Sequence, residues 1–78
     1  MKRDPNTVAE ALRKDMEWFQ GIKQLGTWTE EEIRREERVQ ELYLVVMERY
    51  RIKPHTHAYR FVRSMALRMQ NAEEQAQS

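Results

Sequence analysis

The sequence contains no cysteine, and only two glycines and two prolines interrupt its 78 residues. Without cysteine, the chain can form neither a disulfide framework nor a thiolate metal site. Long apolar runs are also missing, because the longest one, residues 42–47, is far shorter than the roughly 18 residues of a membrane span. We therefore expect no membrane-spanning segment.

The first residues, Met-Lys-Arg-Asp-Pro, are basic, but no apolar stretch follows them, so no signal peptide is expected. With neither a signal peptide nor a membrane span, a cytoplasmic protein is the expectation.

The side-chain sets that most enzymes use are missing as well. Serine occurs only as Ser64 and Ser78, and neither lies in a nucleophile-elbow motif. The sequence has no glycine-rich phosphate loop and no His-Glu-x-x-His motif. We expect a protein that is not an enzyme and that carries no cofactor.

A His-x-His pair, His55 and His57, is the nearest approach to a metal site. Two imidazoles would need one or two further ligands, and the positive charges of Lys53 and Arg60 nearby oppose metal binding. We expect no metal here. The pair is typical of two solvent-facing histidines in a turn, with contact to a phosphate or a partner as the alternative.

The length predicts one domain, residues 1–78, with one modest core. At roughly 25 cal/mol per Å² of buried apolar surface, such a core barely exceeds the conformational entropy of ordering the chain. Binding to a partner or to a second copy is therefore a plausible source of further stability, and a homodimer is plausible.

Periodicity and punctuation predict three helices, with no strand. Apolar residues recur at helical spacing in each of three segments, and Gly26 and Pro54 lie at the joints between them. The expected helices are residues 8–25, 30–51 and 57–71, with Thr56 as a candidate N-cap of the third. Residues 1–6 and 72–78 are expected to be tails, the C-terminal one disordered.

The segment 26–33, GTWTEEEI, predicts a complete helix start. Thr29 and Glu32 have the spacing of a capping box, and Trp28 and Ile33 occupy the two positions of a hydrophobic staple. Gly26 is placed to end the preceding helix in the left-handed conformation. Thr7 and Glu10 repeat the capping-box spacing at the first helix.

Charge is strongly polarised along the chain. Residues 29–48 hold seven Glu and three Arg, whereas residues 49–72 hold five Arg and one Lys without any acidic residue. The first half of the second helix is so highly charged that we expect it to be solvated, to project, or to meet a partner. The basic segment either balances the acidic one, binds nucleic acid or binds an acidic protein surface.

The fold class that follows is all-α: a small three-helix, up-down domain with a long central second helix. The leading functional hypothesis is a non-enzymatic regulator or adaptor that binds another protein. Its expected partner-binding residues are Trp18, Trp28, Arg34, Arg35 and Arg38.

The alternative is a regulator that binds nucleic acid, DNA more than RNA. It would use the basic turn and the third helix through Arg51, Lys53, His55, His57, Arg60, Arg63 and Arg68. Accessory regulators of phages and plasmids are often short, charged helical chains, but that is an association and not evidence from a site.

Overall fold

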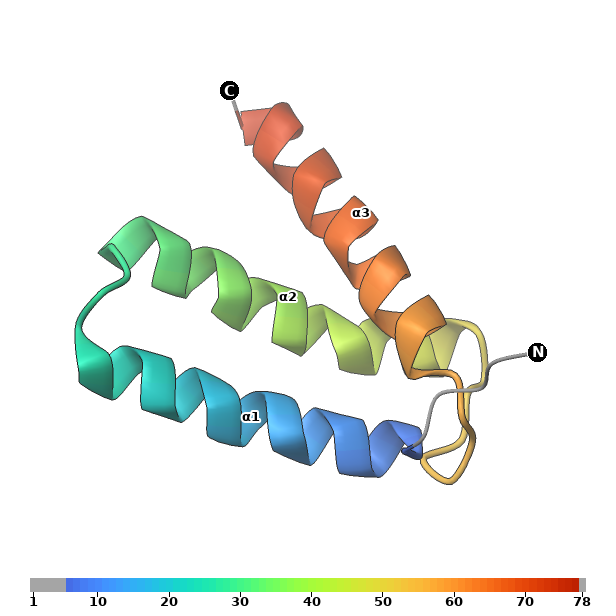
Figure 1. Ribbon diagram of the computed structural model, residues 1–78. Helices are drawn as coiled ribbons and strands as arrows, with labels where there is room; N and C mark the ends of the chain where they lie inside the picture. The colour runs from blue at the N-terminus through green and yellow to red at the C-terminus, as the bar shows by residue number, and fades with distance from the viewer. Residues whose placement is uncertain (1–5, 78) are drawn as a thin grey trace.

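The computed structural model describes residues 6–77, which form three helices and no strand. The helices are α1 (Val8–Leu25), α2 (Glu30–Arg49) and α3 (Tyr59–Gln77). α1 and α2 run antiparallel beside one another, and α3 leaves the connector after α2 at an angle to both (Figure 1). The predicted all-α, three-helix class is confirmed. Residues 1–5 of the predicted N-terminal tail and Ser78 lie outside the described residues.

The connector between α2 and α3 holds the start of α1. The amide of Val8 donates to the carbonyl of Thr56 at 2.8 Å, and the amide of Ala9 donates to the carbonyl of Pro54 at 3.0 Å. The amide of Glu10 donates to the Thr7 hydroxyl at 3.2 Å. Helix-initial amides lack partners within their own helix. The bond to Thr7 is a local cap, and the other two fix the start of α1 against a segment distant in sequence.

The segment 26–33 forms the predicted helix start. The amide of Glu32 donates to the Thr29 hydroxyl at 3.1 Å, and the amide of Thr29 donates to the Glu32 carboxylate at 2.9 Å, which completes the capping box. Gly26 ends α1 with a φ of 70°, in the left-handed region. Trp28 has ring contacts with Trp18 and Phe19, and the staple between Trp28 and Ile33 stays a prediction.

α2 ends in a Schellman motif that has arginine where glycine is usual. The amide of Ile52 donates to the carbonyl of Met47 at 2.8 Å, and the amide of Arg51 donates to the carbonyl of Glu48 at 3.3 Å. Arg51 has a φ of 55°, the left-handed conformation in which a Cβ is unfavourable. α2 therefore ends at Arg49, two residues before the predicted end.

Replacing this arginine should stabilise the fold. Arg51→Gly should raise the free energy of unfolding by about 0.5–1 kcal/mol, because glycine adopts the left-handed conformation without a Cβ clash. Arg51→Ala removes the same side chain but keeps the clash, and should give no such gain. Urea unfolding of the three proteins measures both effects; equal stability of the Gly and Ala variants would contradict the assignment of strain.

The core lies mainly between α2 and α3, which approach each other more closely than α1 approaches either. Its buried residues are Val8, Val39, Leu42, Tyr43, Val46, Val62 and Ala66. α1 contributes Val8 at its start, and Ala11 and Phe19 are also buried. α1 is thus the helix most loosely attached along its length.

α3 differs most from the prediction. It starts at Tyr59 and continues to Gln77, so the prediction of a disordered tail after Asn71 was wrong for the described residues 72–77. Thr56 is not the N-cap, because α3 begins only at Tyr59; its hydroxyl donates instead to the carbonyl of Lys53 at 2.8 Å. The helix continues because Glu73 and Glu74 bind arginines of α2.

The charged first half of α2 is therefore covered on one side and does not project. Glu36, in the middle of that half, is only 7% exposed. The prediction that this half is solvated was wrong at Glu36. As a separate observation, none of the helices within residues 6–77 has the length and apolarity needed to cross a membrane.

Candidate functional site

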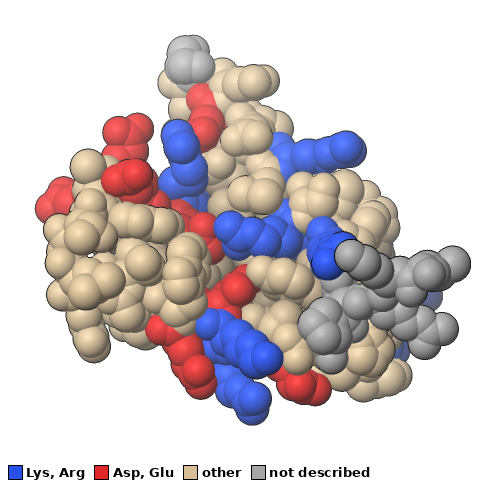
Figure 2. All heavy atoms as spheres, in the orientation of Figure 1, with Lys and Arg blue, Asp and Glu red and all other residues tan. Residues whose placement is uncertain are grey.

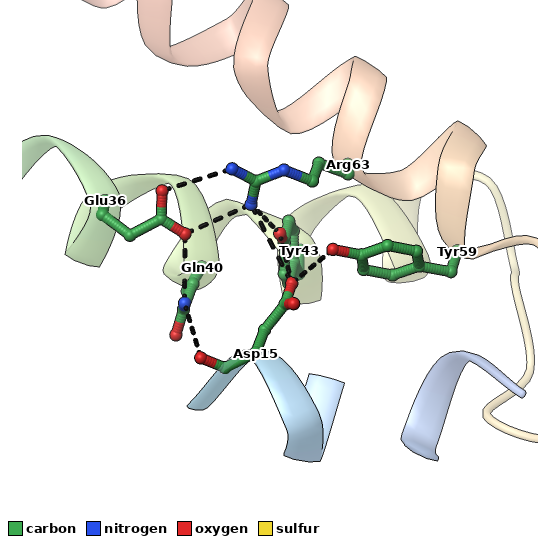
Figure 3. A network of polar contacts seen from close by, with 6 residues as sticks. All are labelled: Asp15, Glu36, Gln40, Tyr43, Tyr59 and Arg63. Atoms are coloured by element: carbon green, nitrogen blue, oxygen red, sulfur yellow. Dashed lines mark hydrogen bonds and ion pairs between the residues drawn. The ribbon is translucent and has the colours of Figure 1, made fainter. Parts of the chain in front are cut away.

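A partly buried polar network joins all three helices (Figure 3). Asp15 comes from α1, Tyr59 and Arg63 come from α3, and α2 supplies Glu36, Gln40 and Tyr43. The hydroxyls of Tyr43 and Tyr59 both donate to Asp15 Oδ2, at 2.9 and 2.5 Å. A single carboxylate oxygen of α1 is thus held by one tyrosine from each of the other helices.

Arg63 completes the network on its other side. Its Nη1 donates to Glu36 Oε2 at 3.1 Å and to the Tyr43 hydroxyl, and its Nη2 donates to Glu36 Oε1 at 3.3 Å. Gln40 Nε2 donates to Glu36 Oε2 at 3.1 Å. The guanidinium therefore grips the carboxylate with two nitrogens, which is the strongest geometry available to this pair.

The environment keeps both tyrosines protonated at neutral pH. Burial raises the pKa of Tyr43 well above its usual range, with a further increase from the hydrogen bond to Tyr59, and Arg63 opposes this only in part. Burial and the hydrogen bond to Asp15 raise the pKa of Tyr59. Each hydroxyl already donates its one proton to Asp15. The network is therefore better suited to holding the helices together than to transferring a proton.

Arg63 stays positively charged in this environment. Burial by itself would lower the pKa of Arg63, but the hydrogen bonds to Glu36 and Tyr43 outweigh burial and raise it. Charge compensation within the network is why Glu36 can lie buried.

The sequence reasoning missed this network, although one signal was present. Asp15 stands in the apolar stripe of α1, four residues after Ala11 and four before Phe19, both of which are buried. A carboxylate on a core-facing stripe requires a partner. Its partners, Tyr59 and Tyr43, are distant in sequence, so the pattern could show the need for a partner without naming it.

Two of the predicted partner-binding arginines, Arg35 and Arg38, bind α3. Arg38 contacts Glu73 through Nη2 at 2.7 Å and Glu41 through Nη1 at 3.1 Å, and Arg35 contacts Glu74 at 2.9 Å. All these side chains remain partly exposed, so each ion pair contributes little by itself. Arg34 is exposed.

These ion pairs predict an acid-sensitive end of α3. The hydrogen bond from Arg38 lowers the pKa of Glu73, and hydrogen bonds from Gln70 and then Arg35 lower the pKa of Glu74. A lowered folded-state pKa stabilises the helix end above the ordinary glutamate pKa of about 4.3, and this stabilisation is lost as the pH falls through the lowered value.

We therefore expect residues 72–77 to lose helical Cα chemical shifts at acid pH before α1 and α2 do. The double variant Glu73→Gln, Glu74→Gln should already show the frayed end at pH 7. An end of α3 that stays helical at pH 7 in this variant would contradict the assigned role of the two ion pairs.

The predicted tryptophans lie together at the α1–α2 connection. The Trp18 and Trp28 rings meet edge to face at 5.6 Å, and the Phe19 and Trp28 centroids are 6.3 Å apart. Trp18 remains 45% exposed, whereas Phe19 is buried. The structure brings these two tryptophans together, while the contacts of Arg35 and Arg38 are with α3.

Trp18 belongs to an uncovered apolar stripe on α1. Gly21, Ile22 and Leu25 follow it at the i+3, i+4 and i+7 positions and line a shallow hollow beside it. Leu25 is 70% exposed, and a Cβ built on Gly21 would meet no atom within 4 Å. We call these four residues the α1 stripe. Such spacing is the pattern with which one helix packs against another.

The predicted nucleic-acid-binding residues divide into two groups. Arg63 points inward into the polar network, whereas the others lie exposed on the connector and the outer face of α3: Arg51, Lys53, His55, His57, Arg60 and Arg68. On the face shown in Figure 2, Lys and Arg alternate with Asp and Glu and form no wide basic area. Within the described residues, no three His, Asp or Glu side chains are grouped as metal ligands.

Comparisons with protein-family models, with curated proteins and with solved structures found no match to this chain.

Proposed function

We propose that this chain is a non-enzymatic adaptor or regulator that binds a partner protein, and that the α1 stripe is its contact surface. The observation that carries the proposal is the apolar series of the stripe, in which Trp18, Gly21 and Leu25 are exposed and Ile22 is partly exposed. Clustered exposed apolar side chains are typical of interaction sites.

The end of the molecule at the α1–α2 connection supports this proposal. It shows a broad area without charged side chains (Figure 2). Trp28 packs edge to face against Trp18, and Trp18 remains 45% exposed. Tryptophan is among the residue types enriched at binding hot spots.

The gap in the helix surface at Gly21, which has no side chain, indicates the kind of partner. A helix can approach another helix closely where a glycine removes the side chain, and Trp18 and Leu25 flank that point one turn away on either side. The partner is therefore expected to present an apolar helix face. Arg34 stays a predicted contact, because it is exposed but no observation connects it with the stripe.

Two substitutions separate binding from stability. Gly21→Gln fills the gap with a side chain that the fold accommodates, and should stabilise α1 by about 0.5 kcal/mol. The same side chain should block the approach of the partner. Leu25→Glu should also abolish binding and leave the fold intact, because Leu25 is 70% exposed. The readouts are affinity capture from the native host, with and without nuclease, and urea unfolding.

The matched control is Leu67→Glu, which makes the same change at a 38% exposed leucine of α3, away from the stripe. It should capture the same protein as the unchanged chain. If the two stripe variants captured that protein as well as the control does, or if nuclease removed all captured material, the stripe would not be a protein-binding surface.

A second candidate, nucleic-acid binding, is favoured by the outer face of α3. Arg60, Ser64, Arg68 and Asn71 are all exposed, share one helix face, and precede the first acidic residue of α3. Arg and Asn are residue types that read base edges in the major groove.

In a mobility-shift assay, Arg68→Ala should weaken binding and reduce the salt slope by about 1. A wild-type chain that shifts no duplex at low salt would exclude this candidate.

A further inference from the structure

A second apolar surface lies between α1 and α2, on a side of this helix pair to which α3 contributes no residue. It is a groove of about 460 Å³ whose apolar lining includes Leu12, Met16, Phe19, Tyr43 and Leu44. Met16 is 61% exposed and Leu44 is 66% exposed, whereas Phe19 and Tyr43 are buried. An antiparallel helix pair with an uncovered apolar groove has the shape of half a four-helix bundle.

The two walls of the groove carry opposite charge. α1 supplies Lys23, whose ammonium lies 4.7 Å from the centre of the Phe19 ring. α2 supplies Glu37 and Glu41. Any occupant must therefore present negative charge to α1 and positive charge to α2.

We propose that the occupant is a second copy of this chain, related to the first by a two-fold axis that runs along the groove. Such an axis keeps the direction of each helix and exchanges left and right. It therefore lays α1 of one copy over α2 of the other, antiparallel to it. Met16 and Leu44, the most exposed apolar residues of the groove, then cover those of the partner copy in an isologous interface.

Two orientations of a two-fold axis, along the groove or across the helices, would bring the grooves of two copies face to face. The charges of the groove walls favour the axis along the groove. An axis across the helices would place α1 on α1 and α2 on α2, so that each wall of the groove would face a wall of its own charge. The axis along the groove preserves the level of each residue. It places the wall with Lys23 of each copy over the wall with Glu37 and Glu41 of the other.

The first test is sedimentation equilibrium of the full chain over a concentration series. The unchanged chain should form dimers as concentration rises, and Leu44→Glu should weaken dimerisation by at least about 100-fold, because it buries an unpaired charge in the interface. Leu67→Glu, the same change on the outer face of α3 where Leu67 is 38% exposed, should leave the dimer intact. Far-UV circular dichroism verifies that each variant is folded.

The second test examines the axis. Lys23→Glu and Glu37→Lys should each weaken the dimer, the double variant should restore it, and an equimolar mixture of the two single variants should form a heterodimer. A chain that stays monomeric up to about millimolar concentration, where even weak specific complexes form, would overturn the proposal. So would dimerisation unaffected by Leu44→Glu, or a double variant that fails to restore what each single change removes.

Discussion

Arg63→Ala is expected to lower the free energy of unfolding by about 2–4 kcal/mol, somewhat less than the typical effect of breaking a fully buried ion pair, because 29% of the Arg63 side chain is exposed. Glu36, only 7% exposed, would lose both bonds from the guanidinium and keep Gln40 as its remaining donor in the network. A domain of this length has a total stability of roughly 4–12 kcal/mol. The variant should therefore lose a large share of its stability and unfold at a clearly lower temperature.

Three matched variants show whether the lost charge is the cause. Arg68→Ala, which removes an exposed arginine from the same helix, should cost less than about 0.5 kcal/mol. Arg63→Lys keeps the positive charge but cannot bind the carboxylate with two nitrogens. Its loss of stability should therefore lie between those of Arg63→Ala and Arg68→Ala. Glu36→Met combined with Arg63→Met removes both charges and should recover most of the stability, because apolar replacement of a whole buried pair is often neutral.

Thermal and urea unfolding followed by circular dichroism measure these differences. If Arg63→Ala were no more harmful than Arg68→Ala, the polar network would be dispensable for the fold. If the double methionine variant were as unstable as Arg63→Ala, the cost would come from lost packing and not from an unpaired carboxylate.

The local features of this fold could be predicted because they depend on residues close in sequence. The capping box of Thr29 and Glu32, and the left-handed end of α1 at Gly26, follow from spacing alone and are present in the structure. Each involves residues no more than a few positions apart, so no knowledge of the tertiary arrangement is needed.

The errors arise where distant residues decide the outcome. A polar C-terminal segment such as residues 72–77 predicts fraying by itself, but Glu73 and Glu74 reach Arg38 and Arg35 on α2 and hold the helix. Arg63 looks like a solvent-exposed arginine in the helical pattern, but Glu36, which is 27 residues earlier, and Tyr43 turn it inward. Tertiary pairing overrides local pattern in both cases.

The same reasoning explains why the candidate binding surfaces were predicted only in part. The sequence indicated Trp18 and Trp28 because exposed tryptophan is typical of binding hot spots. It did not indicate that Gly21 and Leu25 complete the α1 stripe, because the face of α1 that is covered depends on how α2 and α3 lie relative to it (Figure 1). A helix periodicity identifies an apolar face, but the neighbouring elements determine how much of it is buried.

Tyr43 is the position where the apolar core and the polar network coincide, so its replacement should have the other large effect. The side chain is 1% exposed, its ring meets that of Tyr59 edge to face at 6.1 Å, and its hydroxyl binds Asp15 and Arg63. Tyr43→Ala should cost about 3–5 kcal/mol as a cavity in the core. Tyr43→Phe keeps the ring and should cost about 1–3 kcal/mol for the unpaired polar groups.

The pH dependence distinguishes these two contributions. Because burial raises the pKa of Tyr43, its stabilisation is complete below the ordinary tyrosine pKa of about 10 and is lost as the pH rises above that value. Urea unfolding between pH 9 and 11, the range around that value, should thus show a falling free energy in the unchanged chain and a shallower fall in Tyr43→Phe. Tyr50→Phe, at a 46% exposed position, should match the unchanged chain. Equal slopes for all three proteins would mean that the Tyr43 hydroxyl proton does not stabilise the fold. The stabilisation by Tyr43 would then come from the packing of its ring in the core.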